Sequence, residues 1–268
     1  MDRNYNDNLL LTNSKLLKFL NNKVIVMKDR NFYHKEKTED NKINYVMELL
    51  EYKSVIQHDL EKCTGCGICV MVCPKEAIER IDNEEHVHIP KVESCSFCGI
   101  CDYMCPFNAW TLLIDDEHTI PLKENPGNLP DLLGEELVCP KTQKPVVKYL
   151  EGQITIDPKK CPTDCKECID ACMMNVIEFT SLDDKRQVKL NKNNCIFCTA
   201  CTFACPEPEA LMVDRFDIKF DKTQIKSSSV FNEIIRKLIS QEVLAKIIKE
   251  KAQEIAREAT TKLFNIKV

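Results

Sequence analysis

The sequence predicts an α+β protein in which two similar small modules follow one another along the chain. Two observations lead to this prediction. Sixteen of the seventeen cysteines fall into four groups of four with nearly the same spacing, and the groups are arranged in two pairs. Each group precedes residues for one helical turn and a β-rich run, as in PKEAIERI after Cys73 and PEPEALMV after Cys205. The repeat therefore indicates two pseudo-symmetric modules, each with a small sheet beside its cysteines.

Three of the four cysteine groups share the spacing C-x2-C-x2-C-x3-C-P. They are Cys63, Cys66, Cys69 and Cys73; Cys95, Cys98, Cys101 and Cys105; and Cys195, Cys198, Cys201 and Cys205. This is the run with which bacterial ferredoxins bind 4Fe-4S clusters. The remaining group differs by one additional residue after its first cysteine and by Met173 in place of the proline; its members are Cys161, Cys165, Cys168 and Cys172. It still offers four thiolates in the same order.

The spacing has a physical reason. Three cysteines separated by two residues lie on one short loop, where they can present three thiolates to three irons of a cubane. The fourth iron takes its ligand from the remote cysteine of the paired group. We therefore expect four 4Fe-4S clusters, with these iron ligands: Cys63, Cys66, Cys69 and Cys105; Cys95, Cys98, Cys101 and Cys73; Cys161, Cys165, Cys168 and Cys205; and Cys195, Cys198, Cys201 and Cys172.

Five parts of the chain are expected. They are an N-terminal α/β extension at 1–58, a first module at 59–114, a Pro/Gly-rich crossing segment at 115–155, a second module at 156–216 and a C-terminal helical docking tail at 217–268. Each module is expected to be a bacterial-type ferredoxin-like fold that holds two 4Fe-4S clusters. Because such short elements bury little apolar surface, the modules should depend on their metal for stability.

Apolar periodicity predicts the elements at both ends of the chain. Near the N-terminus it indicates a helix at about 9–19, a strand at 23–28 and a helix at about 42–55. We interpret this part as a cap on the first module, with a dedicated docking element as the alternative. From Ser229 onward the pattern is helical, with a break near Ser240. Its apolar stripe could pack on the second module or dock on another subunit; it contains Leu244, Ile248, Ile255 and Ala259.

Composition excludes several classes of protein. The net charge is −5 with Lys and Glu interspersed, so the basic stripe that nucleic-acid binding requires is missing from the sequence. Apolar runs are too short for a membrane span, and the acidic start MDRNYND does not fit a signal peptide. We therefore expect a cytoplasmic protein without disulfides, which could reach a membrane only through a partner.

Some residues admit more than one interpretation. Structural zinc is the alternative metal for the cysteines, but zinc sites typically use two separated pairs rather than three cysteines in succession. Cys139 stands alone in LVCPK and is interpreted as a free thiol, or as the vestige of a lost motif. The five histidines are expected on strand surfaces rather than as ligands. Apolar neighbours of the cysteines are interpreted mainly as core; they are Ile68, Phe97, Ile100, Ile196 and Phe203.

The chain resembles the archaeal polyferredoxins, and most closely the iron-sulfur F subunit of formylmethanofuran dehydrogenase. The resemblance covers most of the chain from about Lys42 onward and rests on four segments: YVMELLEYKSVIQHDLEKCTGCGICVMVCPKEAI, CSFCGICDYMCPFNA, CPTDCKECIDAC and IKSSSVFNEIIRKL. Members of that family are longer and hold more clusters. The resemblance implies an electron path in methanogenic or related archaea, linking a carbon dioxide-reducing molybdenum or tungsten enzyme to external electron donors.

The expected function is thus a non-catalytic electron-transfer subunit of an anaerobic oxidoreductase complex, in particular formylmethanofuran dehydrogenase. Its expected partners are a molybdenum or tungsten catalytic subunit and further iron-sulfur proteins, with no nucleic acid and no direct membrane insertion. No GxGxxG loop suggests a flavin or nicotinamide. The alternatives are a freely diffusing ferredoxin and an iron-sulfur subunit of a hydrogenase or another archaeal oxidoreductase. A reductase with an open iron is disfavoured, because no group lacks a cysteine.

Overall fold

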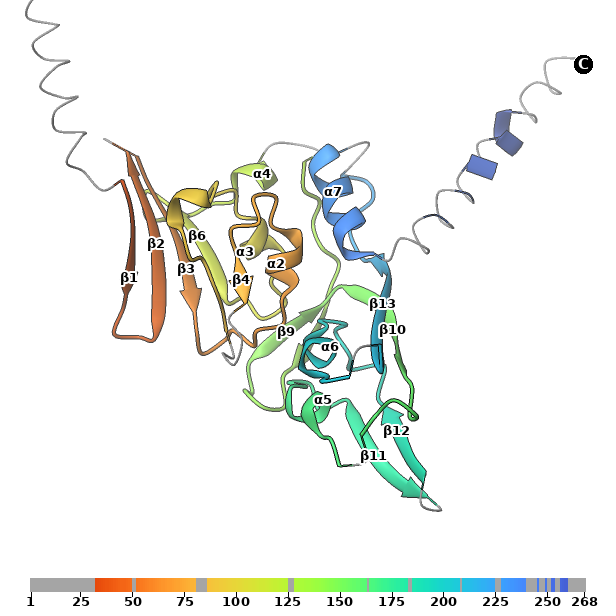
Figure 1. The fold of residues 1–268 in the computed structure, drawn as a ribbon. Coiled ribbons are helices and arrows are strands. Elements are labelled where there is room, and N and C mark those ends of the chain that lie inside the picture. Colours follow the sequence, from red (N-terminus) through yellow and green to blue (C-terminus); the bar gives the residue numbers. More distant parts are fainter. Residues whose placement is uncertain are drawn as a thin grey trace, which may run out of the picture.

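The computed structural model describes most of the chain between residues 32 and 239, in two bodies that lie side by side (Figure 1). The described residues are 32–49, 52–80, 86–124, 128–162, 164–182, 185–207, 209–224, 228–239 and isolated residues between 245 and 259. The helix expected at 9–19 and the strand expected at 23–28 lie outside them. So do Leu244, Ile248 and Ile255 of the expected C-terminal stripe, whereas Ala259 is helical and exposed.

The first body contains an antiparallel five-stranded sheet in the order β1-β2-β3-β6-β7. Its strands are β1 (Tyr33–Lys37), β2 (Lys42–Leu49), β3 (Tyr52–Asp59), β6 (Trp110–Ile114) and β7 (Glu117–His118). Beside the sheet lie the small hairpin and short helices that carry the first two cysteine groups (Figure 1). These are α2 (Ile68–Val72), β4 (Glu79–Arg80), β5 (Val87–His88), η1 (Val92–Ser94) and α3 (Ile100–Tyr103).

The helix expected at 42–55 is wrong, because this segment forms most of the β2–β3 hairpin. The two strands pair from Lys42 opposite Asp59 to Leu49 opposite Tyr52. Ile43, Tyr45 and Met47 alternate along β2 and pack against the same core cluster, which is the two-residue period of a strand. The apolar residues at helical spacing in this segment are therefore not one helical face, and pairing of β3 with β6 makes the hairpin part of the first body.

A buried aromatic cluster holds this sheet against the cysteine loops. Tyr45, His58 and Trp110 are each at most 2% exposed, and the His58 ring stacks on Trp110 with centroids 3.9 Å apart. The expectation that the histidines lie on strand surfaces is therefore wrong for His58. Burial, reinforced by the nearby positive charge of His86, lowers the pKa of His58 from 6.5 to about 3. Its imidazole is thus neutral in the folded protein.

This depressed pKa makes stability fall in mild acid. Below pH 6.5 the imidazole of His58 binds a proton in the unfolded state but not in the folded state. The stability that neutral His58 contributes is therefore complete above pH 6.5 and is lost as the pH falls toward 3. Between pH 7 and pH 5 the loss is about 2 kcal/mol. In anaerobic denaturant unfolding, His58→Phe keeps an aromatic ring on Trp110 and should lose that much less stability than wild type over this range. Equal pH dependence in the two proteins would show that His58 does not titrate as described.

The second body repeats the strand plan of the first. In the first body β3 precedes the cysteine groups and pairs with β6 after them, while β4 and β5 pair between them. In the second body β10 (Leu150–Ile156) pairs with β13 (Leu211–Ile218), and β11 (Ile177–Leu182) pairs with β12 (Lys185–Leu190). The short helices α5 (Glu167–Asp170) and α6 (Ala200–Ala204) carry the third and fourth cysteine groups.

Where the structure describes it, the segment between the bodies forms regular elements and contacts both bodies. It contains α4 (Pro121–Glu124) and a hairpin of β8 (Glu135–Val138) and β9 (Pro145–Lys148). The Val147 amide donates to the Pro106 carbonyl at 2.9 Å, in the first body, and Lys148 Nζ donates to the Asn193 carbonyl at 2.8 Å, in the second. The expected ordered crossing segment thus ends inside β10, a strand of the second body.

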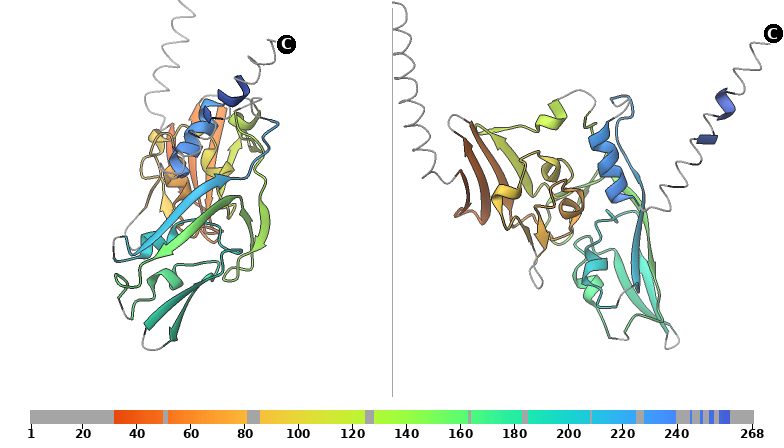
Figure 2. Two further views of the ribbon diagram at one scale, coloured as in Figure 1. Left: turned by 90° about the vertical axis from the view of Figure 1, so that its right-hand side faces the viewer. Right: turned by 45° about the horizontal axis from the view of Figure 1, so that its top comes forward.

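Helix α7 (Ser229–Leu238) returns from the second body to the first. Ser228 Oγ accepts a hydrogen bond from the Phe231 amide at 3.1 Å and caps the helix, which ends near the break expected at Ser240. Its buried face, formed by Phe231, Ile234 and Leu238, joins the core, and the helix lies against α2 (Figure 2). Helix α7 of the expected tail is therefore a component of the fold that packs on α2 of the first body.

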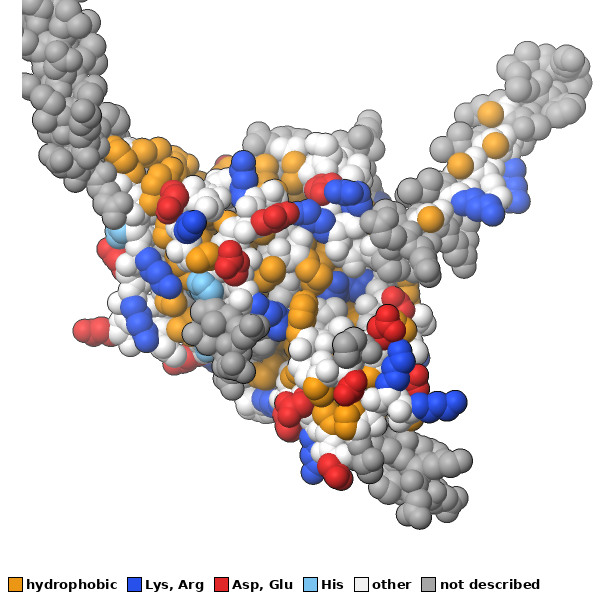
Figure 3. Space-filling view, viewed as in Figure 1, with side chains coloured by type: hydrophobic (Ala, Val, Ile, Leu, Met, Phe, Trp, Pro, Cys, Tyr) orange, Lys and Arg blue, Asp and Glu red, His pale blue; other side chains and the backbone are white. Residues whose placement is uncertain are grey.

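On the face drawn in Figure 3, basic side chains are interspersed with acidic ones rather than gathered into a stripe. Within the described ranges, none of the helices has both the length and the apolar character that crossing a bilayer demands.

Candidate metal centres

The cysteine loops share a backbone geometry that explains part of their sequence. In three groups the residues on either side of the second cysteine have positive φ: Gly65 and Gly67, Phe97 and Gly99, and Phe197 and Thr199. These angles curl the chain so that a short helix starts immediately afterward. Glycine adopts positive φ without steric cost, which accounts for three of the six residues. In the longer third group the residue after Cys165 is Lys166, with φ of −125°.

A second repeated turn follows the last cysteine of each group. Three residues after Cys73, Cys105 and Cys172, the residue has positive φ, and the next amide donates a hydrogen bond back to the cysteine sulfur at 3.3, 3.3 and 3.5 Å. Cys205 differs, because CPEPEA contains one residue more than CPKEA and its sulfur bonds to the Glu207 carbonyl instead. An amide that donates to a sulfur stabilises the negative charge of a metal-bound thiolate, so this turn would support cluster ligation at the first three positions.

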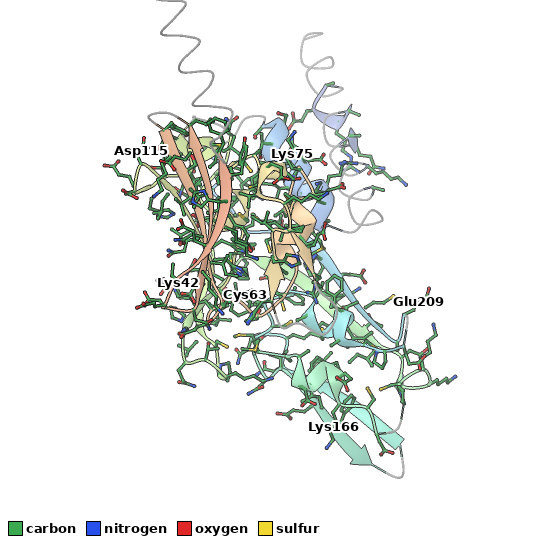
Figure 4. All side chains as sticks on the ribbon, turned by 60° about the vertical axis from the view of Figure 1, so that its left-hand side comes forward. Lys42, Cys63, Lys75, Asp115, Lys166 and Glu209 are labelled. Carbon is green, nitrogen blue, oxygen red and sulfur yellow. The ribbon has the colours of Figure 1, made fainter. Side chains whose placement is uncertain are left out.

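Folding brings the sixteen cysteines together in the four sets expected from the sequence. Each of three sets lines a single pocket with apolar neighbours; these sets are Cys63, Cys66, Cys69 and Cys105; Cys161, Cys165, Cys168 and Cys205; and Cys172, Cys195, Cys198 and Cys201. In the other set, Cys95 lies within electrostatic range of Cys73 and Cys98, and Cys101 within range of Cys95 and Cys98. Figure 4 draws the side chains and labels Cys63, the first residue of the first set. The iron ligation itself stays a prediction.

The protonation of these thiols indicates what the sets can hold. Burial, together with the neighbouring thiols, raises the pKa of Cys168 to about 11 and of Cys201 to about 12. Four crowded thiols become thiolates only if a cationic centre compensates their charge, as the iron core of a cluster does. Among the described residues, no three cysteine, histidine or acidic side chains lie close enough to share a single metal ion. A cubane has its four irons at separate corners, so the four thiols of each set match it in number, with one ligand for each iron.

The sets follow one another in a row. Cys101 lies within electrostatic range of Cys69, Cys66 within range of Cys198, and Cys201 within range of Cys168. The boundary between the bodies is crossed at Cys66, whose carbonyl accepts a hydrogen bond from Thr199 Oγ1 at 3.5 Å. The inner sets, one from each body, are therefore those of Cys66 and Cys198, and the outer sets are those of Cys95 and Cys161.

The residues near the cysteines fall largely, but not entirely, as expected. Ile68, Phe97, Ile100 and Ile196 are buried in the core, whereas Phe203 is 53% exposed and its ring lies under the Arg80 guanidinium. Cys139 is buried outside the four sets, and its thiol donates to the Met173 carbonyl at 3.4 Å. Sequence reasoning missed Arg215, a buried charge on β13. The sequence could have indicated Arg215 only through the alternation of β13, which places this residue on the buried side of the strand.

Comparison with known proteins assigns a family to both cysteine regions. A model described as a 4Fe-4S binding domain matches residues 56–79, and a model described as a 4Fe-4S dicluster domain matches residues 160–208. The chain carries two 4Fe-4S ferredoxin domains. These ferredoxin domains contain three of the four cysteine groups, and the second group lies between the two matched ranges.

A solved structure resembles the whole arrangement of the two ferredoxin domains. It is a chain of the formate dehydrogenase–heterodisulfide reductase–formylmethanofuran dehydrogenase complex from Methanospirillum hungatei, with 25% identity and a TM-score of 0.66. The match covers 78% of this chain and 91% of that chain. None of the curated proteins compared with the chain matches it significantly. The expected resemblance to a polyferredoxin of formylmethanofuran dehydrogenase is confirmed to this extent: the chain has two ferredoxin domains, and its structural neighbour is a subunit of a complex that includes that enzyme.

Proposed function

We propose that this chain is a non-catalytic electron-transfer subunit that relays single electrons through four 4Fe-4S clusters within an oxidoreductase complex. The observation that carries the proposal is the row of four cysteine sets, in which each set lies within electrostatic range of the next. A row of redox sites across two packed bodies suits conduction between two ends of the molecule. When bound, each cluster supplies a centre that exchanges one electron.

The proposed ligands are the sixteen cysteines in the four sets that the fold gathers. The repeated pairing of β3 with β6 and of β10 with β13, each enclosing two cysteine groups, supports two bacterial-type ferredoxin modules. We place these modules at 59–114 and 156–216, each completed by the strand that precedes it. Apolar walls, such as Trp110 beside the first set and Phe107 beside the fourth, exclude water from the sulfur atoms. Exclusion of water is one of the means by which a protein sets a cluster's potential.

Formylmethanofuran dehydrogenase is the proposed complex, and carbon dioxide reduction in the cytoplasm of a methanogen is the proposed context. The support is the structural neighbour, which belongs to an assembly with that enzyme in its name and is matched over 91% of its length. The proposed partners are a molybdenum or tungsten catalytic subunit and further iron-sulfur proteins. A freely diffusing ferredoxin is the second candidate; such carriers are usually smaller and more acidic than this 268-residue chain with a net charge of −5.

The test is anaerobic purification from the native cells, followed by iron and sulfide analysis and reduced-state electron paramagnetic resonance. About sixteen irons per chain, four for each cluster, together with large subunits that contain molybdenum or tungsten, would support the proposal. The same iron content without companions would favour the free carrier. Zinc in place of iron would overturn both.

A further inference from the structure

Arg215 is a buried cation at the boundary between the two bodies. Its side chain is 4% exposed and donates hydrogen bonds to three separate parts of the fold. Nε donates to the Phe197 carbonyl at 2.8 Å, and Nη2 donates to Thr199 Oγ1 at 3.3 Å, both in the loop of the fourth cysteine group. Nη1 contacts Met71 Sδ on α2 at 3.7 Å and the Leu238 carbonyl at the end of α7 at 3.4 Å. The guanidinium therefore lies between the two inner sets.

Arg80 brings a second guanidinium to the same boundary from the first body. It donates to the Gly65 carbonyl, in the loop of the first cysteine group. Its guanidinium lies 3.9 Å from the ring centroid of Phe203, on the helix α6 of the second body. Like Arg215, it lies within electrostatic range of both Cys66 and Cys198. The two arginines thus face the same two sets.

Neither arginine is paired with a carboxylate in the described part of the chain: the partners of Arg215 are carbonyls, a hydroxyl and a sulfur, and Arg80 bonds a carbonyl. An unpaired buried cation is costly to desolvate. Burial lowers the pKa of Arg215, whereas the charges of Cys198, Tyr149 and Cys66 raise it. Burial raises the pKa of Tyr149, which keeps its phenol neutral, so the negative charges that favour the charged guanidinium lie on the cysteine sets on either side.

We propose that Arg215, assisted by Arg80, raises the reduction potentials of the two inner clusters above the values they would otherwise have. The proposal rests on the proposed function, because it requires clusters in the sets of Cys66 and Cys198. Each reduction adds one negative charge, and a fixed cation in a poorly solvated site stabilises the reduced form more than the oxidised form. In the outer sets, the electrostatic environment of Cys95, Cys101 and Cys168 is dominated by burial and by neighbouring cysteines rather than by either arginine.

A purely structural role for Arg215 makes a different prediction. Its hydrogen bonds join the loop of the fourth group to α2 and α7, so its loss could loosen the boundary without acting on charge. Lysine separates the two roles, because it keeps the charge but cannot reproduce the planar fork of donors. A structural role predicts that Arg215→Lys and Arg215→Gln are equally damaging. An electrostatic role predicts that Arg215→Lys retains the potentials and that Arg215→Gln does not.

The experiment is a redox titration of the full chain, followed by low-temperature electron paramagnetic resonance, for wild type, Arg215→Gln and Arg215→Lys. In Arg215→Gln, the resonance signals of some but not all clusters should appear only at lower potential, because those clusters become harder to reduce. The equilibrium constant for one-electron reduction should fall at least tenfold, which is about 59 mV per tenfold step. Arg215→Lys should stay near wild type. Arg236→Gln is the matched control, because Arg236 is exposed on α7 and pairs with Glu233; its potentials should be unchanged.

If the Arg215→Gln protein does not retain its iron, Arg80→Gln provides a second test of the proposal. Arg80 is only partly buried and lies at the edge of the boundary, so its variant should keep its clusters and shift the same components in the same direction. Unchanged potentials in a cluster-loaded Arg215→Gln protein would overturn the proposal. If that protein does not load, unchanged potentials in Arg80→Gln would overturn it. Failure of the proposed function itself would appear earlier, as wild-type protein without iron and sulfide.

Discussion

Replacing Cys66 with alanine is expected to remove about one quarter of the iron bound by each chain, because one of the four proposed clusters loses a ligand. Cys66 is buried, and it lines the pocket of the first set together with Cys63, Cys69 and Cys105. The loss should destabilise the first body while the iron of the second body is retained. Iron and sulfide per chain, with electron paramagnetic resonance of the remaining centres, measure the effect.

Cys139→Ala is the matched control for this experiment. Cys139 is buried like Cys66 but lies outside all four sets, so its replacement should leave the iron content unchanged. Equal loss of iron from both bodies in Cys66→Ala would contradict independent loading. That outcome would instead show that the boundary at Cys66 and Thr199 makes the two bodies one cooperative unit.

Ending the chain after Ser228 is expected to destabilise the protein severely, whereas ending it after Ile239 is not. The first truncation removes α7, whose Phe231, Ile234 and Leu238 are buried. Phe231→Ala alone should lower the free energy of unfolding by about 3–5 kcal/mol, since Phe231 packs edge-on against Phe220 with centroids 4.7 Å apart. Anaerobic urea unfolding of the two truncated proteins and of Phe231→Ala, each compared with wild type, measures these differences.

The same truncations test the proposed docking tail. A chain that ends after Ile239 keeps α7, so a loss of its partners with full iron content would place the docking function in residues 240–268. Retention of all partners would contradict docking by that segment. Asn232→Ala is the control for Phe231→Ala, because Asn232 is exposed on the same helix, and its replacement should change stability by less than about 0.5 kcal/mol.

The sequence was most informative where chemistry repeats. Cysteine spacing predicted which residues the fold would gather, since a loop of three cysteines and a remote fourth can surround a cubane in few ways. The segment 42–55 was predicted wrongly because Ile43, Val46 and Met47 satisfy a helical spacing, while the pairing that selects the strand comes from residues on β3 and β6. Local pattern carries no information about such a partner.

The boundary between the bodies could not be predicted for a related reason. Arg215 has contacts on Met71, Phe197 and Leu238, which lie in three distant parts of the sequence and meet only in the folded chain. Likewise, the apolar face of α7 indicates that the helix is covered, but not that α2 covers it. Long-range contacts of this kind depend on how the two bodies pack rather than on any one segment.

The return of α7 to the first body has a consequence for biosynthesis. Lys237 Nζ donates to the Cys73 carbonyl at 2.9 Å across 164 residues of chain. A ribosome that adds roughly 5–20 residues per second needs about 8 to 33 seconds to make that stretch. During this interval the first cysteine group has been made while the helix that covers α2 does not yet exist. Any metal delivered to the nascent chain at this stage would therefore meet a first body that α7 does not yet cover.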